Sequence, residues 1–208
     1  MNGQTLVDSV REDERTELDR LGSDKAMIAA TNANLDADPV LAHIALTLDG
    51  LRAACESWAD ASDDADASAL YASTAEAAGE EYERVTDAMD GGPSGETPAV
   101  VALLDGFETD PARVGALVGQ SLAFDRTLLQ AVNFFVNEAD ERRANLIRDV
   151  RTAASNRLDE AAAVLDEVCA GEDDWDVAEA AAIAVVDAAY AEYVDALDAL
   201  GIDPKPVC

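Results

Sequence analysis

The sequence predicts an all-α protein, most simply an up-and-down helical bundle with extra helices. Apolar residues recur with helical periodicity along almost the whole chain. Alternating β-branched runs are missing, and helix-breaking residues cluster between long alanine-rich stretches. This pattern is typical of helices that each bury one apolar face. The length of 208 residues suits one domain, residues 1–208, with a core of ordinary size.

Six helices are expected, separated by short breaks. They span, roughly, residues 3–31, 39–60, 65–90, 111–137, 139–170 and 175–200. Asp38 before Pro39, and Asp110 before Pro111, predict N-caps followed by proline at the first helical position. The glycine-rich stretch 91–95 is the one long break, and it divides the domain into two three-helix halves.

The charge of the chain describes its surroundings. Asp and Glu number 44 against 14 Lys and Arg, which gives a formal net charge of −30. Such a surface repels phosphates and anionic lipids, so neither a nucleic acid nor a membrane is an expected partner. Short Asp side chains outnumber Glu by 27 to 17, and Lys occurs only twice. Because concentrated salt screens repulsion between carboxylates, we expect the cytoplasmic protein of a halophile.

Charged residues fall inside several apolar stripes when each residue is placed at about 100° along its helix. Glu17 lies within the stripe of the first predicted helix, Glu81 within the third and Asp125 within the fourth. Arg157 lies within the stripe of the fifth. The second predicted helix has a clean apolar face with no acid on it.

Two interpretations of these charges stay open, because an unpaired buried charge costs several kcal/mol. The three carboxylates could form a site for a metal or small ligand between facing helices. Alternatively, the guanidinium of Arg157 could form hydrogen bonds to two of the carboxylates in a buried salt-bridge cluster. No catalytic residue is predicted, since a single histidine and three widely spaced cysteines support no nucleophilic or metal-knuckle arrangement.

A standard di-iron centre is not expected. Such a bundle uses one Glu on each of two helices and Glu-x-x-His on two others, which requires two histidines. This chain has only His43, and the residue three positions before it is Val40. By its helical angle, His43 lies on the flank of its helix and is predicted to be at the surface or rim.

Three short strings resemble haloarchaeal proteins of the rubrerythrin family. They are residues 17–26, the Phe134-Phe135-Val136 segment and the ending at residues 201–208. The resemblance implies a ferritin-like four-helix bundle, here with two additional helices. In that family a di-iron centre reduces peroxide, often beside a separate rubredoxin-type iron site.

The family's iron ligands are poorly matched in this chain. The resemblance implies that Glu17 stands for the glutamate of the first helix, whereas the Glu-x-x-His pair falls on Ala78 and Glu81. One ligand is thereby missing and the other is a carboxylate. The second helix offers Thr47, Leu48 and Leu51 instead of ligands, and rubredoxin cysteine pairs are absent.

Three hypotheses follow. The first is a ferritin-like bundle without its di-iron peroxidase site and without a required cofactor, which acts as a binding or regulatory protein through self-association or a protein partner. The second is a carboxylate-only Fe or Mn site formed by Glu17, Glu81 and Asp125, with Arg157 as charge partner. The third is a structural self-association module with a buried salt-bridge cluster.

Overall fold

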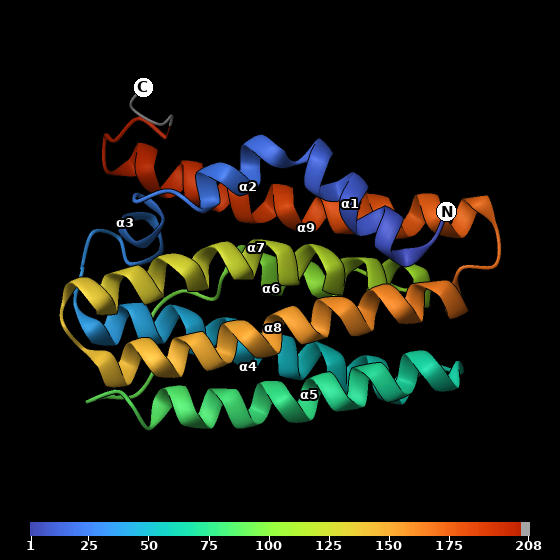
Figure 1. The fold of residues 1–208 in the computed structure, drawn as a ribbon, viewed down its shortest axis with the longest axis horizontal. Helices are drawn as coiled ribbons and strands as arrows, with labels where there is room; N and C mark the ends of the chain where they lie inside the picture. Colours follow the sequence, from blue (N-terminus) through green and yellow to red (C-terminus); the bar gives the residue numbers. More distant parts are fainter. Residues whose placement is uncertain (205–208) are drawn as a thin grey trace.

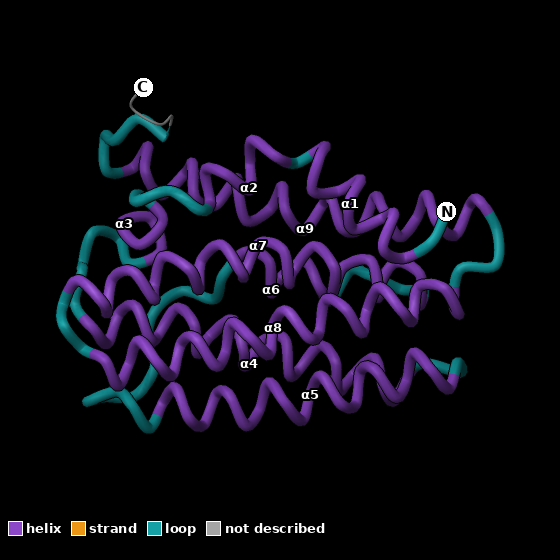
Figure 2. The backbone as a smooth tube through the Cα atoms, in the orientation of Figure 1, coloured by secondary structure: helices purple, strands orange, loops and turns teal. Residues whose placement is uncertain are grey.

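The computed structural model describes residues 1–204 and confirms the all-α prediction. Residues 205–208, with Cys208 and the end of the last family-like string, lie outside the described part. The described residues form helices and no strand (Figure 2). The helices are α1 (Gly3–Asp13), α2 (Arg15–Leu21), α3 (Ala26–Ala30), α4 (Ala37–Ala61), α5 (Ala65–Thr86), α6 (Ala99–Leu104), α7 (Asp110–Asn137), α8 (Glu141–Val168) and α9 (Glu172–Ala199).

Four of the long helices form a bundle. The hairpin of α4 and α5 packs against the hairpin of α7 and α8, mainly through α5 on α8 (Figure 1). Helix α9 covers the other side of α7. The short helices α2 and α3 pack on α9, whereas α1 packs mainly on α8. The bundle is therefore accompanied by more helices than the two expected.

The connection between the two hairpins crosses the length of the bundle. In Figure 1, α5 and α7 both run from right to left. The chain must therefore return from the left end of the bundle, where α5 ends, to the right end, where α7 begins. Residues 87–109, which include α6, make this return. Strict up-and-down alternation is thus broken once, and a single long crossover is the connectivity of ferritin-like bundles.

Helices α7 and α9 run parallel and approach each other closely. A Cβ atom placed on Gly115 would lie 2.1 Å from the carbonyl oxygen of Ala178, and one on Gly119 would lie 2.2 Å from that of Ala182. Glycines spaced by four residues therefore let the two backbones touch. This contact fixes α9 against the bundle.

The predicted helix at 3–31 is three helices. The chain leaves helical geometry at Glu14, where φ is −97° and ψ is 21°, and again between α2 and α3. A single helical wheel therefore does not describe residues 3–31. Each interruption changes the angular position of the residues that follow it relative to those before it. The placement of Glu17 within a single apolar stripe depended on that wheel.

The N-caps also differ from the prediction by one or two residues. Asp36 occupies the N-cap position of α4, although its side chain accepts no capping hydrogen bond. The Asp38 carboxylate accepts hydrogen bonds from the backbone N–H groups of Asp90 and Gly91. Helix α7 is capped by the Thr109 hydroxyl, which places Asp110 in the first turn. Asp38 and the loop after α5 are thereby joined.

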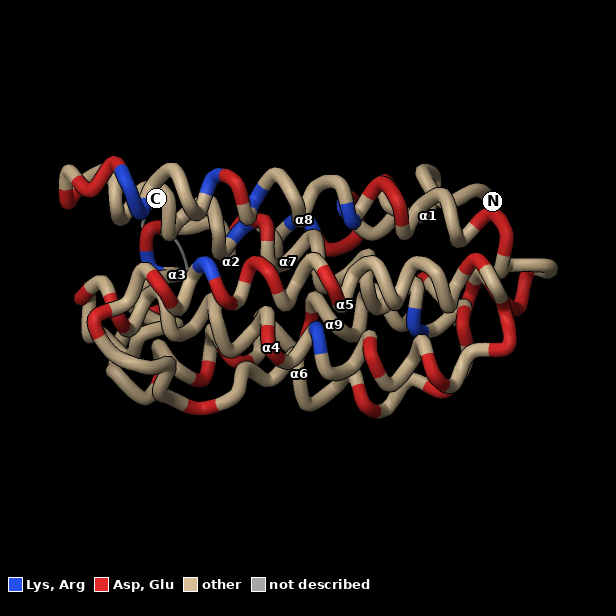
Figure 3. Tube along the Cα trace, turned by 90° about the horizontal axis from the view of Figure 1, so that it is seen from below, with Lys and Arg blue, Asp and Glu red and all other residues tan. Residues whose placement is uncertain are grey.

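Acidic residues recur along the long helices in Figure 3 and outnumber the basic ones. None of the helices in the described part of the chain is both long and apolar enough to span a membrane.

Candidate functional site

Glu81 and Arg157 form a buried ion pair between α5 and α8. Glu81 is 4% exposed and Arg157 is 6% exposed, and Nη1 of Arg157 donates to Oε1 of Glu81 over 2.7 Å. Burial raises the pKa of Glu81, and the neighbouring guanidinium opposes that rise. The expectation that both charges point into the bundle is confirmed.

This ion pair leaves several polar atoms without a protein partner. Oε2 of Glu81 and the Nε and Nη2 atoms of Arg157 are buried and accept or donate no hydrogen bond within the described residues. The hydroxyl of Thr74, two turns before Glu81 on α5, is in the same condition. The pair is thus joined by one hydrogen bond, and Arg157 does not fork onto two acids.

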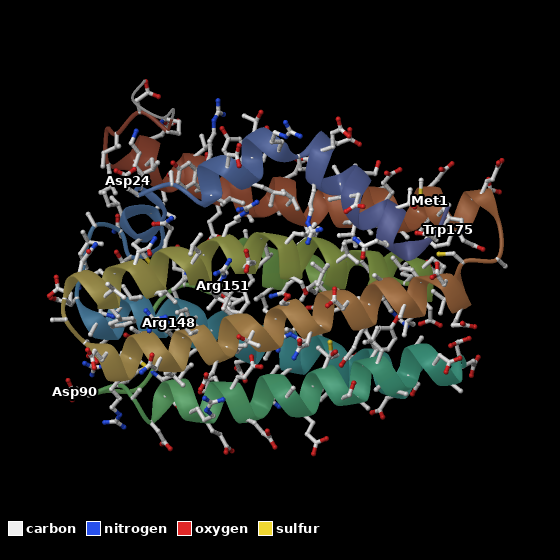
Figure 4. The ribbon with its side chains drawn as sticks, viewed as in Figure 1. Met1, Asp24, Asp90, Arg148, Arg151 and Trp175 are labelled. Carbon is white, nitrogen blue, oxygen red and sulfur yellow. The ribbon has the colours of Figure 1, made fainter. Side chains whose placement is uncertain are left out.

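Asp125 has a different partner. Its two carboxylate oxygens accept hydrogen bonds from Nε and Nη2 of Arg151 over 2.7 and 3.2 Å. Arg151 belongs to α8 and lies between α7 and α8 in Figure 4. Both side chains are about one-third exposed, so Asp125 occupies the boundary of the bundle and not its centre.

Glu17 lies outside the bundle. Its helix, α2, packs against α9 and α7, whereas Glu81 is on α5 at the opposite side of the molecule (Figure 1). The carboxylate of Glu17 lies close enough to Glu14 to raise the pKa of Glu14 by repulsion. Helix α2 therefore does not occupy the position of a bundle helix, which removes the match between Glu17 and the family's first glutamate.

The three predicted metal ligands consequently do not meet. Within residues 1–204, no group of three or more His, Cys, Asp or Glu side chains is arranged to hold a metal ion. Glu81 and Asp125 are each neutralised by their own arginine. The residues present do not fit the carboxylate-only Fe or Mn site.

The acids around Glu14 give a testable pH dependence. Burial, with the charges of Asp187, Glu17 and Asp13, raises the pKa of Glu14 to about 7. Between about pH 4.5 and 7 the folded state then holds a proton that the unfolded state has lost, so stability should fall as pH rises through this range. Urea unfolding at constant salt measures it. Glu14→Gln should flatten the fall; an unchanged pH profile in the variant would contradict the assignment.

A large cavity lies between helices α3, α4, α7 and α9. It has a volume of about 990 Å³ and is partly open to solvent. Residues of α3, α4, α7 and α9 line it, together with the segment 94–100 of the crossover. Its walls are mostly apolar, which is usual for small-molecule sites. We call it the α7–α9 cavity.

Gln120 of α7 is the unusual residue of this cavity. It is 2% exposed, and neither Oε1 nor Nε2 has a hydrogen-bond partner in the described part of the chain. A buried carboxamide without partners costs about 1–3 kcal/mol. Buried Thr47 on the facing helix α4 donates its hydroxyl proton to the carbonyl oxygen of His43, so it does not satisfy Gln120.

Carboxylates gather at the α9 side of the cavity. Glu192 is half-buried, and its Oε2 accepts a hydrogen bond from the backbone N–H of Ala99 over 2.9 Å. Burial raises the pKa of Glu192, the Ala99 hydrogen bond lowers it, and the charge of Glu96 raises it further. Asp195 also lines the cavity, and none of the lining residues is Lys or Arg.

His43 is half-buried in the cavity wall and is neither a surface residue nor a metal ligand in any cluster of the described chain. Burial lowers its pKa to about 4. The imidazole is therefore neutral near neutral pH. This partial exposure in the cavity wall agrees with the predicted rim position and not with the surface alternative.

Gln120 and Glu192 were not identified from the sequence. The sequence of α7 predicts one apolar stripe. In the structure, this helix is covered on two sides, by the bundle and by α9. The available signal was the pair Gly115 and Gly119, which marks the second covered side immediately before Gln120. A polar residue beside such a contact would have been a candidate for burial.

Comparisons with models of protein families, with curated proteins and with solved structures found no match.

Proposed function

We propose that the protein is a non-catalytic binding protein whose ligand is a small molecule held in the α7–α9 cavity. The observation that carries this proposal is Gln120, a residue of the cavity wall whose two polar atoms are buried without a partner in the described part of the chain. A ligand that hydrogen-bonds to the carboxamide would offset the cost of burying it. Within the described residues, no hydroxyl side chain of the cavity is hydrogen-bonded to the imidazole of His43, so binding without chemistry is the simplest function.

The same proposal places the chain on a rubrerythrin-like scaffold that has no di-iron centre. The single long crossover after α5 supports this origin. So does the position of Glu81 and Arg157, which join two bundle helices in the interior where such scaffolds hold their ligands. The ion pair then serves stability, and the binding role belongs to the cavity outside the four-helix core.

The halophilic cytoplasm is the setting that we propose, and the charge of −30 supports it. Melting temperature measured across a KCl series tests this setting. The melting temperature should fall steeply as the salt is removed, because the carboxylates then repel one another over a longer range. An unchanged or rising melting temperature at low salt would contradict it.

Self-association or a protein partner remains a prediction with no surface assigned to it. The large apolar side chains that are exposed in the described part of the chain belong to four different segments. They are Met1, Leu35, Val136 and Val177.

Gln120→Leu tests the binding proposal through opposite effects on stability and binding. The free energy of unfolding should be about 1–3 kcal/mol higher for the variant than for the parent, because the substitution removes two unpartnered polar atoms at nearly constant volume. A screen of small molecules by melting temperature in molar KCl should find compounds that stabilise the parent and not the variant. A variant that is less stable, or that responds equally to every compound, would contradict the proposal.

A further inference from the structure

The charges of the α7–α9 cavity restrict its ligand. Three acidic residues line it, Glu96, Glu192 and Asp195, and no Lys or Arg does. A chain with net charge −30 adds further repulsion to an anion that approaches the opening. An anionic ligand is therefore disfavoured at this site.

Glu192 is the carboxylate best placed to meet a cation. Its Oε2 already accepts the N–H of Ala99, whereas Oε1 accepts no hydrogen bond within the described part of the chain. Glu96 lies near enough to disturb it electrostatically. A positive charge between the two acids would relieve this repulsion. Phe124 and Tyr193 also line the cavity, and aromatic side chains attract cations.

The distance between Glu192 and Gln120 sets the length of the ligand. Gly115 lies against Ala178 and Gly119 against Ala182, so parallel α7 and α9 are in register with an offset of 63 residues. Ile183 is then level with Gln120, and Glu192 follows nine residues later. At about 1.5 Å per residue this separation is about 13 Å along the helices.

Resting on the proposed function, we infer that the ligand is an elongated organic ammonium ion. Its positive end binds between Glu192 and Glu96, an apolar spacer lies along the cavity wall, and an amide or similar group at the other end pairs with the carboxamide of Gln120. The structure thus assigns recognition of the ammonium group to α9 and the crossover, and recognition of the amide end of the ligand to α7.

Isothermal titration of the full chain with three matched probes tests this inference. Monoacetylated diaminobutane carries an ammonium and an amide, N-butylacetamide carries the amide alone, and acetamidobutanoate replaces the ammonium by a carboxylate. The spacer of these probes leaves about 3 Å for a hydrogen bond at each end of the site. We expect the cationic probe to bind at least tenfold more tightly than the neutral one, and the anionic probe to bind most weakly.

Variants separate the two ends of the site. Glu192→Gln should weaken the cationic probe about tenfold and leave the neutral probe unchanged, because the carboxamide can still accept the N–H of Ala99. Gln120→Leu should weaken both probes about tenfold. Glu160→Gln, an exposed acid of α8 outside the cavity, is the control of equal charge and should change nothing.

The failures are distinguishable. If neutral and cationic probes bind equally and both lose affinity in Gln120→Leu, the cavity is a binding site and the inferred charge of the ligand is wrong. If binding is insensitive to Gln120→Leu but weakened by Glu160→Gln, the probes bind the acidic surface and both proposals fail. If none of the probes binds, the inferred ligand class is wrong, and the screen with Gln120→Leu decides the proposed function separately.

Discussion

Replacing Arg157 with methionine should lower the free energy of unfolding by about 3–5 kcal/mol, the largest effect that we expect of any single substitution in this chain. The substitution leaves the Glu81 carboxylate buried with no cation beside it, since Arg157 is its only ion-pair partner in the described residues. Urea unfolding in high salt measures the loss. Arg151→Met is the matched control, because its pair with Asp125 is about one-third exposed and should contribute about 1 kcal/mol or less.

The double variant Glu81→Leu/Arg157→Met should recover most of that loss. Removing both charges also removes the three unpartnered atoms of the pair, and apolar side chains of similar volume can fill the space between α5 and α8. Exchanges of this kind are often neutral or stabilising by about 1–4 kcal/mol. A double variant as unstable as Arg157→Met alone would show that the pair does more than neutralise itself.

Gly119→Ala should destabilise the protein by about 1–3 kcal/mol, although alanine is the better helix former. The new Cβ atom would lie 2.2 Å from the carbonyl oxygen of Ala182, which is backbone and cannot rotate away. Helices α7 and α9 must therefore separate, and adding Gly115→Ala should increase the loss.

Gly79→Ala on α5 is the control for the glycine substitution. Its Cβ would meet only the flexible Arg52 side chain, with Cδ at 3.3 Å, so this variant should gain up to about 1 kcal/mol. Equal melting-temperature changes in Gly79→Ala and Gly119→Ala would contradict the close contact between α7 and α9.

The longer helices could be predicted from the sequence because each has a continuous apolar periodicity and clear breaks. The predicted 111–137 corresponds to Asp110–Asn137, and 65–90 to Ala65–Thr86. The failure at 3–31 has a physical reason: short helices α1, α2 and α3 are separated by one to four residues, and periodicity alone does not report a change of axis.

The candidate site shows the same limit. Glu81 and Arg157 could be found because each lies in the middle of a narrow stripe on a helix with one buried side, and both are buried. Asp125 belongs to a helix covered on two sides, where the centre of one stripe need not be the centre of the protein. The α7–α9 cavity forms where α3, α4, the crossover and α9 meet. The periodicity of one helix does not predict how several helices meet.

The binding of a ligand at Gln120 can be observed directly by NMR of the side-chain amides. The chain has three glutamines, and the other two are internal controls: Gln4 donates to Asp8 and Gln130 donates to the carbonyl of Gly22. Protein labelled with ¹⁵N at glutamine side chains would be titrated with monoacetylated diaminobutane in high salt. We predict that the Gln120 resonances shift with saturation while those of Gln4 and Gln130 stay in place. Saturating binding that leaves Gln120 unmoved would contradict the assignment of the cavity as the functional site.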